Sequence, residues 1–428
     1  MERILLRHID IPDIANINVY EDNLGYTALK KTIKELNRHD VINIIERSGL
    51  RGRGGAGFST GKKLSFIPDV KGHKYVICNA SEGEPGTFKD RELIEKNPHQ
   101  IIEGLVIAAY AIDASIGYIF VKEKFKSQVA ALERAIDDAY KRGYLGEGIY
   151  HSSFRFDVRI HRCPDLYICG EESALLETIE GKKVMPRLKP PFPAVSGLFG
   201  RPTLINNAET LADLPYIINR GGEWFSSIGT KNSTGQRIFS VSGDVNRRGN
   251  YELEMGITLR EIIYKEAGGV KDGKEVKAVI PGGVSASYLT SDHLDISMDF
   301  DSVAGAGSML GTGGIIVFSH DNCMVRETLQ IAKFFHKESC GKCTPCREGT
   351  YWLYSILNRI ESGNGRYEDI ELISDISDNM SGTSLCALCD GAINPVVSSL
   401  KYFRDEYEFH IKEKRCHVSK DVGVWTNH

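Results

Sequence analysis

Apolar and polar residues follow two different periods along the middle of the chain. Short apolar runs bounded by turn residues favour buried strands, and longer segments with helical periodicity lie between them. The predicted strands cover residues 75–78, 117–121, 154–160 and 166–169, and the predicted helices cover residues 98–112, 127–142 and 211–219. This alternation predicts an α/β domain over residues 71–230, with a largely parallel sheet whose ligand lies at the carboxyl ends of the strands.

The remaining segments have other patterns. Residues 1–70 are weakly patterned, apart from a predicted helix at 41–46 and a glycine-dense loop near their end. Residues 236–320 combine predicted strands at 237–242, 251–253, 277–280 and 315–318 with a helix at 259–267, an order that suggests a β-grasp unit. Residues 322–428 are predicted to be a helical bundle, with helices at 325–336 and 348–361 on either side of a cysteine-rich loop.

The cysteines of this loop indicate a metal centre. Cys340, Cys343 and Cys346 have C-x2-C-x2-C spacing, and Cys386 follows forty residues after the last of them. Three thiolates so spaced hold three corners of a [4Fe-4S] cluster, and a fourth thiolate from elsewhere closes the cage. Zinc is the competing metal, although its sites more often contain two C-x2-C pairs. Cys386 and Cys389 form such a second pair, so spacing alone leaves the choice between them open.

Composition limits the classes of partner. The 428 residues include 53 Lys and Arg and 57 Asp and Glu, interspersed to a net charge of −4, so no nucleic-acid footprint is visible. No apolar run approaches the roughly twenty residues that cross a bilayer, so we expect no direct membrane insertion. The clustering of the cysteines and the absence of a signal peptide suggest a reducing cytoplasm.

Several loops carry candidate ligand-binding residues. The glycine-dense segment 51–57 lets main-chain N–H groups approach a phosphate closely, although it fits neither standard nucleotide motif. Polar loops at 79–87 and 170–175 follow predicted strands, and the helix macrodipole alone would also account for Glu171 and Glu172 at a helix start. Residues 187–193 form a proline-stiffened segment that carries Lys189 and Phe192.

Taken together, six segments resemble the NADH-oxidising flavoprotein subunit of respiratory NADH:quinone oxidoreductase (complex I) and the diaphorase subunits of NAD-linked hydrogenases and formate dehydrogenases. The six segments occur in the family's order at residues 51–58, 84–91, 167–172, 189–193, 206–210 and 340–347. The resemblance implies a Rossmann-like FMN/NADH domain, a β-grasp domain and a helical domain that holds a [4Fe-4S] cluster. It also implies an enzyme in which FMN takes a hydride from NADH and single electrons leave through the cluster.

The resemblance assigns roles to the matching residues. The implied FMN and cofactor contacts are Gly52, Arg53, Gly54, Gly55, Gly57, Lys63, Asn79, Ser81, Glu82, Gly170, Glu171, Glu172, Asn206, Asn207 and Thr210. The implied NADH contacts are Phe58, Phe66, Glu84, Lys189 and Phe192, with Glu84 and Glu171 as catalytic residues. The implied cluster ligands are Cys340, Cys343, Cys346 and Cys386.

Three positions depart from the family pattern. Ser81 stands where the family usually has Asp, residues 162–166 replace a glycine-rich turn, and Cys389 replaces a usual glycine. The thioredoxin-like [2Fe-2S] domain and the ferredoxin domain of fused relatives are missing. We therefore expect a thioredoxin-fold [2Fe-2S] subunit and a further iron–sulfur subunit as partners, which would attach the protein to the inner face of the membrane.

Two alternative functions remain open at this level. The same module can reduce NAD+ or bifurcate electrons in a hydrogenase, a formate dehydrogenase or a related complex. A non-catalytic electron-wiring scaffold is the second alternative, and the presence of Glu84, Glu171 and Lys189 argues against it.

Overall fold

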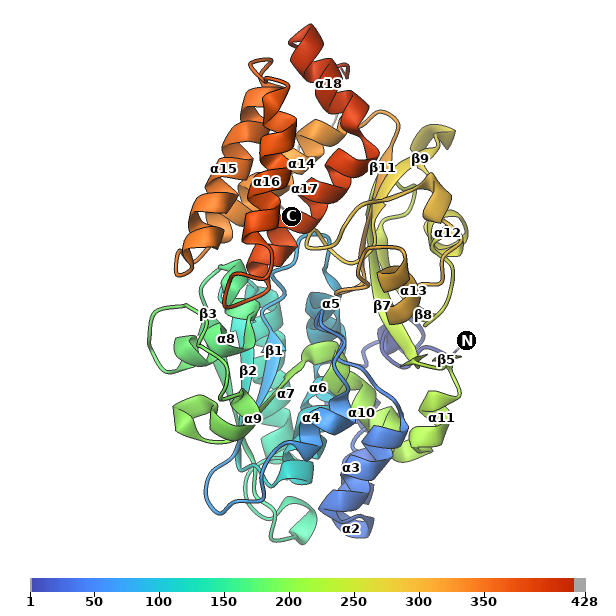
Figure 1. Cartoon of the computed structure of the whole chain (residues 1–428). Helices are drawn as coiled ribbons and strands as arrows, with labels where there is room; N and C mark the ends of the chain where they lie inside the picture. Colours follow the sequence, from blue (N-terminus) through green and yellow to red (C-terminus); the bar gives the residue numbers. More distant parts are fainter. Residues whose placement is uncertain (1, 419–428) are drawn as a thin grey trace.

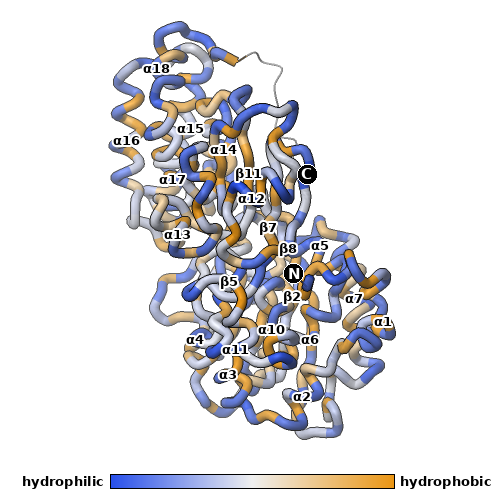
Figure 2. The backbone as a smooth tube through the Cα atoms, turned by 90° about the vertical axis from the view of Figure 1, so that its right-hand side faces the viewer, coloured by the Kyte–Doolittle hydropathy of each residue, from blue (hydrophilic) through white to orange (hydrophobic). Residues whose placement is uncertain are grey.

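The computed structural model describes residues 2–418 and contains two larger sheets and a helical bundle. Figure 1 shows the bundle above the first sheet, with the second sheet beside both. Seen from the side in Figure 2, the bundle and the second sheet form one lobe, and the first sheet with its helices forms the other. The lobe of the first sheet also contains four helices from residues 17–65: α1 (Ile17–Asp22), α2 (Thr27–Glu35), α3 (Arg38–Arg47) and α4 (Thr60–Ser65).

The first sheet was predicted to be largely parallel, and all of its strand pairs are parallel. Its strands are β1 (Tyr75–Ala80), β2 (Ile116–Lys122), β3 (Asp157–Cys163) and β4 (Thr203–Asn207), in the order β3-β2-β1-β4. The register pairs Cys78 with Asn206 and Asn79 with Asn207, so both asparagine-bearing strand ends lie at the same edge. The predicted ligand side of the sheet therefore carries polar side chains.

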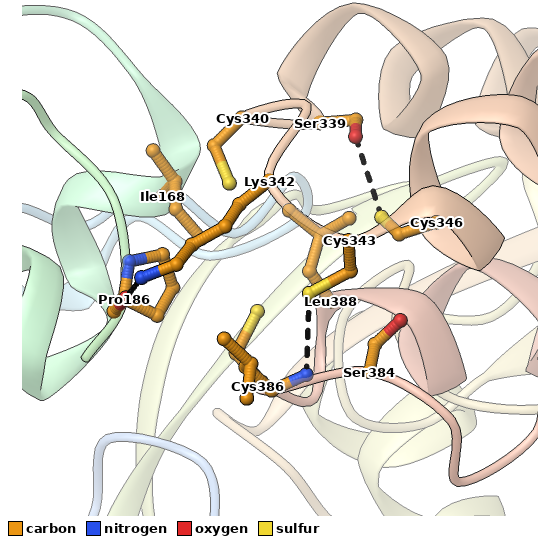
Figure 3. A pocket seen from close by; sticks show the side chains of 11 residues that line it. Ile168, Pro186, Ser339, Cys340, Lys342, Cys343, Cys346, Ser384, Cys386 and Leu388 are labelled. Atoms are coloured by element: carbon orange, nitrogen blue, oxygen red, sulfur yellow. Dashed lines mark hydrogen bonds between the residues drawn. The ribbon is translucent and has the colours of Figure 1, made fainter. Parts of the chain in front are cut away.

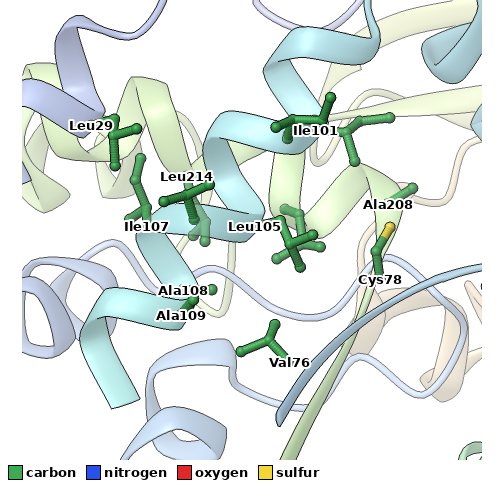
Figure 4. Packing of buried hydrophobic residues seen from close by; sticks show 14 of the residues in the cluster. Leu29, Val76, Cys78, Ile101, Leu105, Ile107, Ala108, Ala109, Ala208 and Leu214 are labelled. Carbon is green, nitrogen blue, oxygen red and sulfur yellow. The ribbon is translucent and has the colours of Figure 1, made fainter. Parts of the chain in front are cut away.

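Helix α6 (Pro98–Ile112) forms the centre of the core behind this sheet and has the predicted bounds. It packs against α10 (Ala208–Arg220) so closely that a Cβ on Gly104 would lie 1.9 Å from the main-chain oxygen of Leu211. Figure 4 shows Leu105 of α6 together with Val76 and Cys78 of β1 and Ala208 of α10. Helices α5 (Lys89–Lys96) and α7 (Lys126–Lys141) flank α6.

Two local predictions in this region were wrong. Residues 166–169 do not form a strand, because Tyr167–Gly170 is a 3-10 helix that leads into α8 (Glu172–Ile179). Only Ile168 and Cys169 of this run are buried, and so short an apolar run has the same appearance in a strand or a helical turn. The fourth strand is β4, and the helix expected from residue 211 begins at Ala208 because Asn207 caps it by accepting from Glu209 N at 3.0 Å.

The second sheet has the predicted β-grasp character. Its strands are β7 (Gln236–Gly243), β8 (Gly249–Glu254), β9 (Val276–Ile280), β10 (Leu289–Thr290) and β11 (Gly314–Ser319), in the order β10-β9-β11-β7-β8. Strands β7 and β11 are parallel neighbours, and the other pairs are antiparallel. The predicted helix 259–267 is a short α12 (Leu259–Glu261) continued by one π-turn (Ile262–Glu266).

The bundle comprises α14 (Met324–Glu338), α15 (Thr344–Glu361), α16 (Glu368–Met380), α17 (Leu388–Tyr402) and α18 (Arg404–Glu413). Leu353, Ile373 and Val396 lie in its core, on inward faces of three of these helices. Among residues 2–418, we found no helix with both the length and the apolar character that a membrane span requires. The division of the chain into domains at residues 70, 230 and 320 stays a proposal. Residues between 4 and 64 share a hydrophobic core with α6 and α10, so the segment before residue 70 packs as part of the first α/β domain.

Candidate active site and metal centre

The glycine-dense loop lies at the carboxyl ends of β1 and β4. A Cβ on Gly54 would approach the Cβ of Asn207 to 3.1 Å, and Arg53 N donates to Thr210 Oγ1 at 2.8 Å. Gly55 has a φ of 136°, which favours glycine, and no described atom beyond its chain neighbours lies within 4 Å of the position that its Cβ would take. The loop thus rests on the start of α10 and leaves an open main-chain face, which suits a phosphate.

Three asparagines at this edge have different surroundings. Asn79 Nδ2 donates to the main-chain oxygen of Gly170 at 2.9 Å, and Asn207 Nδ2 donates to Asp90 Oδ2 at 2.6 Å. Asn206 is buried, and its Nδ2 has no hydrogen-bond partner within the described residues. A buried amide without a partner is costly, so this group fits a bound polar ligand such as a flavin.

A cluster of opposite charges joins three segments that are distant in sequence. Lys189 Nζ lies 2.9 Å from Glu171 Oε1 and 2.8 Å from Glu172 Oε1, and Lys63 Nζ lies 3.6 Å from Glu172 Oε2. Burial acts to raise the pKa of Glu172, but the two lysines outweigh it and lower that pKa below its usual value. Four of the predicted contact residues are thereby brought together.

Three predicted aromatic contacts are exposed on the surface. Phe58, Phe66 and Phe192 are 51%, 57% and 57% exposed, and the ring centroids of Phe58 and Phe66 lie 6.0 Å apart. Large apolar rings gain little from exposure to water, whereas their faces are free to stack on a base. The structure therefore leaves these rings available to a planar ligand.

Glu84 occupies a different environment from the one expected of a nucleotide contact. Its Oε1 accepts from Ser285 N at 2.8 Å, and its Oε2 accepts from Ser285 Oγ at 2.9 Å and from Tyr167 Oη at 2.6 Å. Burial raises the pKa of Glu84 above its usual range, although these donors favour the charged form. Its carboxylate therefore connects the first sheet to the β-grasp unit.

Tyr167 is the functional candidate that the sequence did not single out. Its hydroxyl contacts Glu84 and Ser285, and its main-chain N donates to Glu338 Oε2 at 2.7 Å. It thus touches the loop after β1, the β-grasp unit and the last residue of α14. Tyr167 belongs to the family-like segment 167–172 (Tyr-Ile-Cys-Gly-Glu-Glu), and this membership could have marked it as a candidate. Its side chain is uncharged, so the sequence gave no chemical reason to select it.

Two predicted cofactor residues direct their side chains into the protein. The Arg53 guanidinium is buried and donates to the main-chain oxygens of Thr234 and Gln236 at 3.0 and 3.1 Å. Glu82 accepts from Asp90 N at the start of α5 at 2.7 Å, and burial raises its pKa to about 7. These side chains shape the loops that they belong to.

Ser81 and Lys89 lie beside the loops that are predicted to bind FMN. Ser81 Oγ donates to Asn79 Oδ1 at 2.9 Å, so a neutral hydroxyl stands where the family usually has a carboxylate. Lys89, which the sequence analysis did not select, lies 2.7 Å from both Asp90 Oδ1 and Glu209 Oε2. Its charge is therefore neutralised inside the protein.

The four predicted metal ligands line one cavity. Figure 3 shows Cys340, Cys343, Cys346 and Cys386 around it. Cys340 and Cys343 precede α15, Cys346 lies in its first turn, and Cys386 precedes α17. Leu385 N donates to Cys343 Sγ at 3.4 Å. Four convergent thiols with a main-chain donor fit a cubane cluster, whose sulfurs commonly accept such hydrogen bonds.

Cys389 lies outside this cavity. Its side chain is buried, and its Sγ donates to the main-chain oxygen of Met380 at 3.5 Å. The residues lining the cavity include Cys386 and exclude Cys389. We therefore propose Cys386 as the fourth ligand.

The metal centre adjoins the polar edge of the first sheet. Ile168 lines the cysteine cavity, and Gly170, two residues further on, is held by Asn79. Lys342 Nζ also donates to the main-chain oxygen of Pro186 at 2.6 Å, in the segment that leads to Lys189. One short 3-10 helix therefore separates the two candidate cofactor sites.

A phosphate-type glycine loop on a parallel sheet, next to a cavity of four cysteines, defines a flavin-binding iron–sulfur oxidoreductase component. Three family descriptions match successive parts of the chain: Nuo51 FMN-binding domain at residues 45–216, SLBB domain at 237–317 and NADH-ubiquinone oxidoreductase-F iron-sulfur binding region at 326–410. The chain belongs to the family of NADH-quinone oxidoreductase F subunits. Its cofactors are FMN and a [4Fe-4S] cluster, which resolves the choice between iron and zinc at the four cysteines.

Relatives cover nearly the whole chain. The NADH-quinone oxidoreductase F subunit numbered 2 in Rhizobium meliloti is 50% identical over 97% of this chain and 99% of its own length. The NADH-quinone oxidoreductase F subunit of Mycobacterium bovis is 47% identical over 96% of this chain and 94% of its own. A crystal structure of an NAD+-reducing [NiFe]-hydrogenase in the H2-reduced state superposes with a TM-score of 0.82 at 31% identity, covering 96% of this chain and 67% of that one.

Proposed function

We propose that this protein is the NADH dehydrogenase flavoprotein subunit of an electron-transfer complex. The observation that carries the proposal is the short connection between the two cofactor sites, because Ile168 borders the cysteine cavity and Gly170 is held at the flavin edge by Asn79. Bound FMN accepts two electrons as a hydride from NADH and releases them singly, which is what an iron–sulfur cluster requires.

The flavin site is built from main-chain and amide donors. We assign the phosphate to the open face of the loop at Gly55, where the start of α10 adds positive potential. Asn206 Nδ2, which has no partner in the part of the chain that the structure describes, would donate to the flavin. Thr210 fixes the loop through Arg53 N, so its role is to position these groups.

The nucleotide site lies beside the charge cluster. We assign Phe58, Phe66 and Phe192 to stacking on the adenine or nicotinamide faces, since all three rings are exposed. Lys189 is held by Glu171 and Glu172 and would exchange one of these contacts for a phosphate or a hydroxyl of NADH. We keep Glu171 as a proposed flavin contact and reassign Glu84 as a positioning residue.

A second candidate is the reverse reaction, in which the same module reduces NAD+. It is favoured by the structural similarity to an NAD+-reducing hydrogenase. The proposed cofactor-binding residues are compatible with NADH oxidation and with NAD+ reduction. The direction of electron flow would therefore depend on the electron donor or acceptor that the partner subunits supply.

We further propose that the chain works as one subunit of a multisubunit complex. Its relatives are named as subunits, which supports this. A thioredoxin-fold [2Fe-2S] subunit and a further iron–sulfur subunit are the proposed neighbours. They would hold the chain at the cytoplasmic face of a membrane.

Anaerobic purification of the full chain tests the proposal. One FMN and about four irons per chain are expected, together with bleaching of the flavin absorbance by NADH. Asn206→Ala should lose most of its FMN, whereas Asn219→Ala, near the end of α10 that lies away from the glycine loop, should retain it. Wild-type protein that binds FMN but is not reduced by NADH would overturn the assignment and favour the scaffold alternative.

A further inference from the structure

A second group of metal-ligating side chains lies in the helical bundle, outside the [4Fe-4S] site. Cys323, His410, Cys416 and His417 each offer one ligand atom, and these four atoms all lie within 4.8 Å of one another. Cys323 caps α14, His410 belongs to α18, and the other two follow α18. We propose that these four residues bind a structural Zn²⁺ ion.

The separations suit one tetrahedral ion. Zinc binds Cys sulfur at about 2.3 Å and His nitrogen at about 2.0 Å, which places neighbouring ligand atoms about 3.3 to 3.8 Å apart. Cys323 Sγ already lies 3.4 Å from His410 Nε2. Small side-chain rotations at Cys416 and His417 would complete the shell, because both lie in the segment after α18 and are less buried than the other two.

His410 is oriented for coordination by its other ring nitrogen. Nδ1 lies 2.7 Å from the main-chain oxygen of Glu406, one helical turn earlier in α18. When Nδ1 donates to this carbonyl, Nε2 carries the lone pair and points toward Cys323, which is the usual outer-shell arrangement of zinc-bound histidine. The imidazole is fully buried, so its direction is fixed by packing.

Main-chain donors support both sulfurs. Arg326 N donates to Cys323 Sγ at 3.5 Å, and Val418 N donates to Cys416 Sγ at 3.4 Å. Such contacts favour the thiolates that zinc requires, and binding would release the two thiol protons.

Two carboxylates border the group as competing partners. Glu361 Oε2 lies 3.0 Å from His410 Nε2, and Glu406 Oε2 lies 3.7 Å from His417 Nε2. Glu361 also pairs with Arg326 at 2.9 Å, and Glu406 pairs with Lys277 at 2.5 Å. Each carboxylate therefore keeps a cationic partner when the metal takes the histidine.

The donor set and its size favour zinc over other occupants. A two-iron cluster with two Cys and two His separates the cysteine pair from the histidine pair by the width of the cluster, whereas here Cys323 Sγ and His410 Nε2 are adjacent. A tetrahedral S2N2 set is typical of structural zinc. The four side chains leave no position for a substrate, so the predicted role is structural.

The site lies at the opposite end of α14 from the iron–sulfur loop. Helix α14 has 15 residues, a length of about 22 Å, with Cys323 before its first residue and Cys340 just beyond its last. Figure 1 shows α18 at the outer end of the bundle. Zinc there would fasten the segment after α18 to the start of α14 and so brace the helix that leads to the cluster ligands.

Metal analysis of the full chain, purified anaerobically from zinc-supplemented cells and dialysed against a chelator, tests the proposal. One zinc per chain is expected in addition to the iron. Zinc K-edge X-ray absorption should show two sulfur ligands at about 2.3 Å and two nitrogen ligands at about 2.0 Å. Cys416→Ser and His417→Ala should each lower the zinc content at least tenfold while FMN and iron stay at wild-type levels.

Arg415→Ala is the matched control, because Arg415 precedes the ligand pair and contributes no ligand atom. It should retain full zinc. Absence of zinc from the wild type, a zinc shell of four sulfurs, or a Cys323–Cys416 disulfide in the anaerobic protein would overturn the proposal. Should a variant fail to fold, the absorption spectrum of the wild type decides the ligand set by itself.

Discussion

Tyr167 Oη donates a hydrogen bond of 2.6 Å to the buried carboxylate of Glu84, and the main-chain N of Tyr167 donates to Glu338 at 2.7 Å. Glu84 in turn holds Ser285 of the β-grasp unit. Tyr167 therefore joins the edge of the first sheet, the β-grasp unit and α14, the helix that precedes the cluster loop. We infer that these contacts help to align the two cofactor sites.

Tyr167→Phe should lower the free energy of unfolding by about 1 to 3 kcal/mol, because it leaves a buried carboxylate with one donor fewer. Loss of a donor to the charged form should also raise the pKa of Glu84 further. Thermal or chemical denaturation checks this against Tyr264→Phe, a change at an exposed position. Equal stability of the two variants would contradict the bridging role.

The raised pKa of Glu82 predicts that the stability of the folded protein depends on pH. Burial raises its pKa from about 4.5 to about 7 in the folded protein, so the folded state binds a proton more tightly than the unfolded state. Its contribution to stability is therefore full below about pH 4.5 and is lost as the pH rises to about 7. Glu82→Gln should remove this dependence, so the stability of the wild type relative to the variant should fall between pH 5 and pH 7, as measured by denaturant titration. A constant difference would show that Glu82 does not titrate in this range.

Lys189→Ala should raise the KM for NADH by roughly 5- to 150-fold, as expected for loss of one charge-assisted hydrogen bond worth about 1 to 3 kcal/mol. FMN content should not change, since the glycine loop and Asn206 remain. Lys182→Ala is the control, because Lys182 is an exposed cation that pairs with Glu180 just beyond α8. Steady-state kinetics with a small artificial acceptor provide the measurement. An unchanged KM would remove Lys189 from the nucleotide site.

Cys343→Ser separates hydride acceptance from onward transfer. NADH should still reduce the flavin and support activity with a small acceptor that reaches FMN directly, whereas electron delivery to the partner subunits should fall to background. FMN content is determined first, because loss of a cluster can loosen the bundle.

Cys389→Ser is its matched control and should keep the cluster, since Cys389 lies outside the cavity that the other four cysteines line. Iron analysis of both variants checks the assignment. If Cys389→Ser lost the cluster and Cys343→Ser kept it, Cys389 would be a cluster ligand and Cys343 would not.

Local sequence patterns were sufficient to predict features that depend mainly on neighbouring residues in the chain. Helix α6 has its predicted bounds because Pro98 starts it and its residues are apolar on almost every face, so packing and propensity agree. The spacing of Cys340, Cys343 and Cys346 likewise indicated a metal centre before any fold was known. The glycine loop indicated a phosphate site for the same reason.

Relations between distant segments were decided only by the tertiary structure. The prediction of a strand at residues 166–169 failed because burial against the bundle, and not periodicity, determines that turn. Our proposal of Cys386 over Cys389 as the fourth ligand likewise rests on the tertiary structure, because Cys386 lines the cavity.

The sequence by itself determined the chemistry that the chain carries: the thiols, the glycine loop and the charged residues of the nucleotide segments. Only the tertiary structure decided which of these groups meet. Tyr167 reaches Glu84 across 83 positions, and Cys323 reaches His410 across 87. Such contacts arise when whole helices and sheets pack, and no local period in the sequence encodes them.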